Sequence, residues 1–200
     1  MANFNAIAPF YDAIKKLVFQ NSINKATEHF ISSLPPVASI LIIGGGTGAL
    51  LKHFNPKQQI TYLEASAKMI EIAKEREYHC KVHFIKADLR NHVWETQFDA
   101  IISPFILDCF SEEALTSILS GLNDQLKIDG LWLHADFYPQ NAFQGSLVKL
   151  MYFFFRLTAK LSVSSIPDFD LCFKELPLSL EKKLLLRSGF IQSRLYRKID

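Results

Sequence analysis

Short apolar runs alternate with segments of helical periodicity along most of the chain. The runs have the length of strands buried on both faces of a sheet, and they cover residues 38–43, 59–63, 81–85, 98–103 and 131–137. Between them, apolar residues recur every three or four positions, which predicts helices at 49–54, after Ser66 and after Ser111. This alternation predicts an α/β fold, with a doubly wound, mostly parallel sheet and helices on both faces.

Helical patterns also precede the first strand. Residues 11–34 predict a helix in two pieces, which Pro35 and Pro36 end. We therefore expect residues 1–36 to form a helical cap on a single domain that spans residues 1–200.

The pattern changes after the fifth strand. Residues 147–163 predict a helix that is apolar nearly all round, within a lid-like insertion at 141–177 that otherwise reads as loop. A helix is expected at 178–187 and a last strand at 190–197. In the insertion helix, we expect one stripe to pack on the sheet, formed by Leu147, Leu150, Met151, Phe154, Leu157 and Leu161. The other aromatic residues of this helix, Tyr152, Phe153 and Phe155, must then pack against something other than the sheet. The candidates are the cap helices, a hydrophobic acceptor, a dimer partner and peripheral contact with a membrane.

Charge and cysteine content narrow the class of protein. The net charge is +2, from 22 basic and 20 acidic residues, which argues against a nucleic-acid surface. Three sparse cysteines make no disulfide framework, and we find no signal peptide and no membrane span. We therefore expect a cytoplasmic protein. Cys80 and His83 have the spacing of metal ligands but lack a second pair, so no metal site is expected.

A glycine-rich loop, Gly44-Gly45-Gly46-Thr47-Gly48, follows the first strand. Such a loop lets a ligand lie against the backbone. Gly44, Gly46 and Ala49 match the dinucleotide pattern G-x-G-x-x-G/A, and Glu64 follows Gly44 by 20 positions, where a ribose-binding acid is expected. Gly44, Gly46 and Gly48 equally match G-x-G-x-G, a pattern typical of sites for S-adenosylmethionine (SAM).

Features outside the loop favour SAM over NAD. A helical cap precedes the first strand, whereas dinucleotide-binding domains often begin at that strand. Asp88 and Leu89 follow the third strand, where the carboxylate can accept from an adenine amino group and the leucine N–H can reach the ring. A dehydrogenase catalytic set is missing, because Tyr11 and Lys15 match Y-x-x-x-K but lie in the cap.

Motifs in this order and spacing give the chain a family resemblance. They are "ILIIGGGTG", "YLEAS", "KADL", "FDAIISPFILDCF", "LKIDGLWLHADF" and "RSGF", with "FNAIAPFYD" at the start. Over nearly its whole length the chain resembles a class I SAM-dependent methyltransferase, and it is similar to the quinone-biosynthesis and related small-molecule methyltransferases. The resemblance implies a Rossmann-like fold, SAM as cofactor and S-adenosylhomocysteine as product. The implied cofactor-binding residues are Tyr11, Gly44, Gly46, Gly48, Glu64, Ala65, Asp88, Leu89 and Ser103. Tyr11 is implied to close over the methionine end of SAM.

Two features depart from the family pattern. Ile42 stands two positions before the first glycine, where the family usually has an acid that contacts the methionyl end of SAM. The family also ends in an antiparallel pair of strands, and the residues after Phe190 leave room for only one. We therefore expect the seventh strand to be missing, shortened or supplied by another segment.

Methyl transfer from a sulfonium is an in-line displacement, so the protein mainly aligns the acceptor and excludes water. A base is needed only where the acceptor loses a proton, and ligands bind at the carboxyl ends of parallel strands. The candidate catalytic residues are Asp136, His134 and Tyr11, although a histidine in mid-strand like His134 is more often a buried structural residue. Asp108 could equally contact the substrate or cap the helix that follows.

These features predict a SAM-dependent methyltransferase acting on a small apolar or aromatic acceptor. The alternatives are a SAM-binding module without turnover, which Ile42 and the short C-terminus motivate, and an NAD-dependent oxidoreductase.

Overall fold

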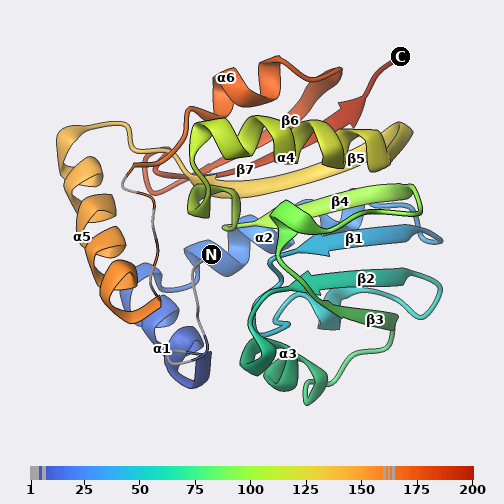
Figure 1. The fold of residues 1–200 in the computed structure, drawn as a ribbon, viewed down its shortest axis with the longest axis horizontal. Coiled ribbons are helices and arrows are strands. Elements are labelled where there is room, and N and C mark those ends of the chain that lie inside the picture. Colours follow the sequence, from blue (N-terminus) through green and yellow to red (C-terminus); the bar gives the residue numbers. More distant parts are fainter. Residues whose placement is uncertain (1–4, 6–7, 160, 162, 164) are drawn as a thin grey trace.

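The computed structural model describes residues 5, 8–159, 161, 163 and 165–200. Within this part of the chain, seven strands form one sheet in the order β3-β2-β1-β4-β5-β7-β6 (Figure 1). The strands are β1 Ser39–Ile43, β2 Gln59–Glu64, β3 Lys81–Lys86, β4 Phe98–Pro104, β5 Leu126–Phe137, β6 Leu178–Leu186 and β7 Ile191–Lys198. β1 to β5 pair in parallel, and β7 lies antiparallel between β5 and β6. The predicted α/β architecture is confirmed.

The helices lie around this sheet and at one end of it (Figure 1). They are α1 Ala8–Phe19, α2 Ser22–Glu28, α3 Ala67–Lys74, α4 Glu112–Gln125, α5 Ala142–Ala159 and α6 Phe169–Lys174. α1 and α2 are the two pieces of the predicted cap. Ser66 and Ser111 cap α3 and α4 as expected, since their side chains accept hydrogen bonds from the N–H groups of Met69 and Ala114.

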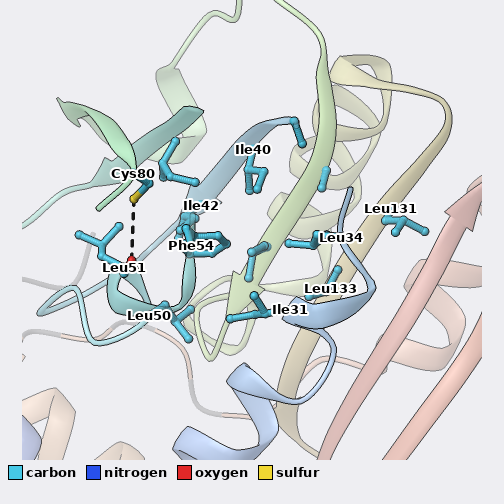
Figure 2. Close-up of a cluster of buried hydrophobic side chains, with 14 of the residues drawn as sticks. Ile31, Leu34, Ile40, Ile42, Leu50, Leu51, Phe54, Cys80, Leu131 and Leu133 are labelled. Atoms are coloured by element: carbon cyan, nitrogen blue, oxygen red, sulfur yellow. Dashed lines mark hydrogen bonds between the residues drawn. The ribbon is translucent and has the colours of Figure 1, made fainter. Parts of the chain in front are cut away.

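β1 is buried on both faces of the sheet. Ile40 and Ile42 belong to one apolar cluster, and Leu41 and Ile43 belong to another on the opposite face. Figure 2 shows Ile42 beside Phe54 in the first of these clusters. Ile42 therefore has a packing role, and a carboxylate at this position would lose its hydration among apolar side chains.

The helix expected at 49–54 is largely absent. Only a 3₁₀ turn, Leu51–His53, forms there. Asn55 and Pro56 follow the glycine loop so closely that a full α-helix cannot propagate between them. The loop therefore presents backbone groups without the dipole of a long helix behind them.

The helix expected at 178–187 is wrong, because this segment is strand β6. It pairs with β7 from Leu178–Lys198 at one end to Leu186–Ile191 at the other, so the seventh strand is present. The sequence of β6, "LSLEKKLLL", has no strict alternation because most of its side chains are exposed at the sheet edge. Lys182 and Lys183 there discourage pairing with another sheet.

Smaller differences occur around β5. The strand begins at Leu126 rather than 131, and Asp129, which has a positive φ, lies within it where the β4–β5 register shifts. In the insertion, helix α6 forms where loop was expected, with Asp168 as its cap.

The stripe predicted to pack α5 on the sheet is wrong in part, because Leu147, Met151 and Leu161 pack against the cluster beside β5 and β7 but the other three residues do not. The buried side chains of α5 are Val148, Tyr152 and Ala159, whereas Leu150 and Leu157 of the expected stripe are exposed. Helical periodicity cannot select a face when a helix is apolar nearly all round, so tertiary contacts decide it. One such contact is the hydrogen bond from the Tyr152 hydroxyl to the Asp108 carbonyl, at 3.0 Å.

Candidate functional site

The glycine loop leaves β1 at the carboxyl end of the sheet, where the end of β2 shapes it. The N–H of Gly44 donates to the carbonyl of Leu63 at 2.8 Å. The Tyr62 hydroxyl donates to the carbonyl of Gly46, also at 2.8 Å. Glu64 Oε2 accepts from the N–H of Gly46 at 3.1 Å. Glu64, which the sequence predicts as a ribose-binding acid, thus contacts the loop directly.

The glycines of the loop have different reasons to lack a side chain. A Cβ on Gly45 would lie 2.2 Å from the Tyr62 ring, and one on Gly44 would lie 2.5 Å from Ile106, so the protein itself fills these places. Gly46 has a φ of +63°, and a Cβ there would meet no atom within 4 Å. Gly46 is therefore where a ligand can approach the backbone.

Glu64 is held in place by backbone donors on both sides. Its Oε1 accepts from the N–H of Ser66 at 2.8 Å, and its side chain is buried. Burial raises the pKa of Glu64, while the hydrogen bonds from Ser66 and Gly46 lower it. The carboxylate is therefore oriented before any ligand arrives, and Ala65 is half-buried beside it.

Asp88 and Leu89 lie at the carboxyl end of β3. Asp88 accepts from the N–H of Arg90 at 3.0 Å and forms an ion pair with the Arg90 guanidinium at 2.6 Å. The hydrogen bond from Arg90 lowers the pKa of Asp88. Leu89 is buried. Asp88 and Leu89 follow β3, the strand that pairs with the Glu64 strand β2, as expected. The carboxylate of Asp88, however, is already paired with Arg90.

A contact network that the sequence did not suggest joins α1 to the glycine loop. The Thr47 hydroxyl donates to both carboxylate oxygens of Asp12, at 3.0 and 3.1 Å. Arg76, which follows α3, pairs with Asp12 at 2.5 Å and donates to the Thr47 carbonyl. Asp12 ends the "FNAIAPFYD" motif, and this position was the one available signal.

A small hollow of about 70 Å³ adjoins the glycine loop. Its walls include Gly44, Gly45, Gly46 and Thr47, together with Tyr11, Ile23 and Phe105. The predicted residue Tyr11 thus lines the same hollow as the loop.

An apolar cavity of about 500 Å³ lies beside the hollow, between the cap helices and α5. Tyr11, Ile23 and Phe105 line both spaces, so the two meet at these side chains. Phe105 has a φ of +53°, an uncommon conformation for a phenylalanine, and the bond from its N–H to the Ala135 carbonyl stabilises it. The other lining residues that the structure describes are Val18, Phe19, Asp108, Cys109, Phe137, Leu147, Leu150, Met151, Tyr152, Phe154, Phe155 and Leu161.

Asp108 and Asp136 are two buried carboxyl groups, and the first of them lines this cavity. Burial raises the pKa of Asp108 to about 6. Asp136 is fully buried, and its Oδ1 accepts from the N–H of Phe137 at 2.9 Å. Burial and then the charge of Asp108 raise the pKa of Asp136 well above its usual value. Asp108 does not cap a helix, since it lies within the 3₁₀ turn Leu107–Cys109.

His134 and Ser103 lie inside the protein, away from both spaces. The Trp132 indole donates to Ser103 Oγ at 2.9 Å, and His134 Nδ1 lies 3.2 Å from the same oxygen. The rings of Phe169 and Phe173 lie 4.9 Å from the His134 ring. Burial and then the charge of Arg194 lower the pKa of His134 to about 3. This placement does not support His134 as a base or Ser103 as a cofactor contact, because packing on α6 shields both.

Within the described residues, no group of three His, Cys, Asp or Glu side chains is arranged to hold a metal ion. Over the same residues, no helix is long and apolar enough to cross a membrane.

Known proteins share this fold and sequence pattern. Residues 40–130 match the methyltransferase domain family Methyltransf_25. A malonyl-[acyl-carrier protein] O-methyltransferase from Priestia megaterium (strain DSM 319 / IMG 1521) is 34% identical over 141 residues, which cover 67% of this chain and 49% of that protein. The chain thus spans about half the length of this curated relative.

Solved methyltransferase structures superimpose on nearly the whole chain. The DhpI–SAH complex has a TM-score of 0.73 at 16% identity, covering 98% of this chain and 93% of the other. The 1,6-didemethyltoxoflavin-N1-methyltransferase of Burkholderia thailandensis, with bound 1,6-didemethyltoxoflavin and S-adenosylhomocysteine, has a TM-score of 0.66 at 14% identity. This superposition covers 97% of this chain and 85% of the Burkholderia thailandensis enzyme. At these identities the likeness concerns the fold.

Proposed function

The chain belongs to the class I SAM-dependent methyltransferase family, and we propose that it transfers a methyl group from SAM to a small, apolar or aromatic acceptor. One observation carries the proposal: the open backbone at Gly46, with the Glu64 carboxylate against it, lies next to a large apolar cavity.

The residues at the carboxyl end of the sheet fit SAM. The space at Gly46 admits the methionine part of SAM against the loop backbone, and Glu64 can accept hydrogen bonds from the two ribose hydroxyls once it exchanges its present partners. Asp88 and Leu89 would hold the adenine, and Tyr11 would close over the methionine end. Ile42 does not argue against SAM, because that residue packs in the core.

When bound, SAM supplies a methyl group already activated on a sulfonium. The protein then needs to align the acceptor and keep water out. Tyr11 and Phe105 lie where the two spaces meet, so they are placed to orient the acceptor toward the methyl group. The aliphatic and aromatic walls of the cavity exclude water from this point.

The apolar cavity and the exposed face of α5 also bear on what the chain binds. The relative from Priestia megaterium is named for a malonyl-[acyl-carrier protein] as its acceptor, but for this chain we favour a small free acceptor because the described cavity is apolar. We propose that the exposed apolar face of α5 contacts a second copy of the chain. Location in the cytoplasm, and no role for nucleic acid, stay predictions.

Calorimetric titration with SAM, S-adenosylhomocysteine and NAD tests the cofactor. We expect SAM and S-adenosylhomocysteine to bind and NAD not to bind. Replacing Glu64 with Ala should weaken S-adenosylhomocysteine binding by at least about 100-fold, because two hydrogen bonds to a charged group are lost. Glu95→Ala, at an exposed acid, is the matched control.

Binding of NAD without a response to SAM would overturn the proposal. Unchanged affinity in Glu64→Ala would show that the ribose is held elsewhere. The melting temperature of each variant separates a binding effect from a loss of fold.

A further inference from the structure

The acceptor cavity has an unusual distribution of charge. Of its described lining residues, Asp108 alone carries a formal charge, and the others are apolar, aromatic or the neutral Cys109. The Cys109 thiol donates to Asp108 Oδ1 at 3.5 Å, so this carboxyl group has one weak donor from a side chain. A lysine or arginine that could pair with an anionic acceptor is missing from the described lining.

A second carboxyl group, that of Asp136, interacts electrostatically with Asp108. Asp136 is fully buried, and its Oδ2 has no hydrogen-bond partner among the described residues. An acceptor that brought its own carboxylate into this cavity would meet the Asp108 carboxylate in apolar surroundings, without a compensating cation among the described lining residues. A malonyl group, which the name of the Priestia megaterium relative gives as its acceptor, is an acceptor of this kind.

We propose that this cavity binds acceptors whose nucleophile carries a proton, namely a phenol, alcohol or amine on an apolar skeleton, and that Asp108 accepts that proton during methyl transfer. This inference rests on the proposed function, and it separates the substrate class of this chain from the carboxyl acceptor of its relatives. The position of Asp108 suits the role of proton acceptor, since the residue follows β4 and lines the same cavity as Tyr11 and Phe105.

Methyl transfer to such an acceptor is accompanied by loss of the acceptor's proton. The oxygen or nitrogen of the acceptor forms a bond to the methyl carbon of SAM while the carbon–sulfur bond breaks, and that electron pair stays on sulfur as the thioether of S-adenosylhomocysteine. The proton of the acceptor passes to the Asp108 carboxylate and from there to solvent. The pKa of Asp108, raised by burial to about 6, leaves it ionised at neutral pH and a better base than an exposed aspartate.

Three probes on one carbon skeleton test the substrate class: 4-hexylphenol, 4-hexylaniline and 4-hexylbenzoate. Their binding is measured by the melting temperature and by calorimetry at pH 7.5, with the protein saturated with S-adenosylhomocysteine. Methylated products are then sought by mass spectrometry with SAM. We expect the phenol or the aniline to bind at least about tenfold more tightly than the benzoate, because only the benzoate adds a negative charge. Methyl transfer should occur to the phenol or the aniline and not to the benzoate.

The Asp108→Asn variant tests the role of the residue. We expect its binding of S-adenosylhomocysteine to be unchanged, its discrimination against the benzoate to disappear, and methylation to fall by at least about 100-fold. In the wild type, kcat/KM should rise with pH through about 6, and the variant should lack this rise. Asp124→Asn, at an exposed acid on α4, is the control for loss of a carboxylate.

The outcomes separate this inference from the proposed function. If S-adenosylhomocysteine fails to bind the wild type, the proposed function fails. If it binds but the benzoate binds as tightly as the phenol and the aniline, or none of the probes binds, the assignment of the cavity is overturned. If Asp108→Asn keeps the rate and the pH profile of the wild type, Asp108 is not the proton acceptor.

Discussion

Individual residues of this chain have roles that their position in a motif does not reveal. Ile42 replaces an expected acid because it packs beside Phe54 in the core. His134 shares a strand face with Asp136, as the alternation of β5 requires, yet it lies between the rings of α6. The sequence identified the chemistry of these side chains but not their surroundings, and the surroundings decide whether a titratable group can react.

The buried His134 predicts a pH dependence of stability. Its pKa is about 3 in the folded protein and about 6.5 in the unfolded chain, so below pH 6.5 the unfolded chain takes up a proton that the folded protein does not. Stability is complete above pH 6.5 and falls with pH below it. From pH 7 to pH 5, we expect this group to lower the free energy of unfolding by about 2 kcal/mol.

Urea unfolding of wild type and His134→Gln at both pH values measures this effect. The difference between the two proteins isolates the histidine, because the raised pKa values of Asp108 and Asp136 act in both. Substitution of the exposed His83 is the control for loss of a histidine. Equal pH dependence in wild type and His134→Gln would contradict the prediction.

At the scale of elements, contacts distant in sequence decided what local pattern could not. Segment 178–186 has a helix-compatible pattern, but its backbone groups pair with β7 along its whole length. α1 is placed by Asp12, whose carboxylate binds Thr47 of the glycine loop and Arg76 beyond α3. The cap is therefore attached to the same loop that is proposed to bind SAM.

Replacing Asp12 with Ala should loosen α1 from the loop. We expect faster hydrogen exchange over residues 8–19, unchanged exchange in α4, and about tenfold weaker binding of S-adenosylhomocysteine, because α1 carries Tyr11. Mass spectrometry after deuterium labelling measures the exchange. Glu71→Ala removes an exposed ion pair with Lys68 and should have no effect on either measurement.

At the scale of the whole molecule, α5 stands at one end of the sheet with α1 (Figure 1). Its inner face closes the apolar cavity. Phe143, Leu150, Phe153 and Leu157 of α5 are 80%, 64%, 58% and 70% exposed, and of these four Leu150 also lines the cavity. These residues share one side of the helix at successive spacings of seven, three and four residues, so they form a continuous apolar stripe rather than scattered exposed residues.

This stripe predicts association between copies of the chain. We expect sedimentation velocity to show a dimer that forms with increasing concentration in the wild type, and a monomer in the Phe153→Ser, Leu157→Ser double variant. The melting temperature of the monomeric form should change little, since both side chains are exposed. Val37→Ser with Val93→Ser, at exposed sites outside α5, is the matched control. A wild type that stays monomeric but binds lipid vesicles would assign the stripe to a membrane surface instead.

The sequence by itself determined the features that depend on local spacing. Apolar runs and serine caps located the parallel strands, α3, α4 and the place of Glu64 at the end of β2, because these features need only residues near in the chain or one strand apart. The tertiary structure alone decided the features that depend on distant partners. It selected β6 over a helix through pairing with β7, chose the buried face of α5 through Tyr152, and placed Asp108 rather than His134 at the cavity. In each case several conformations or positions satisfied the local pattern, and burial against a distant segment distinguished them.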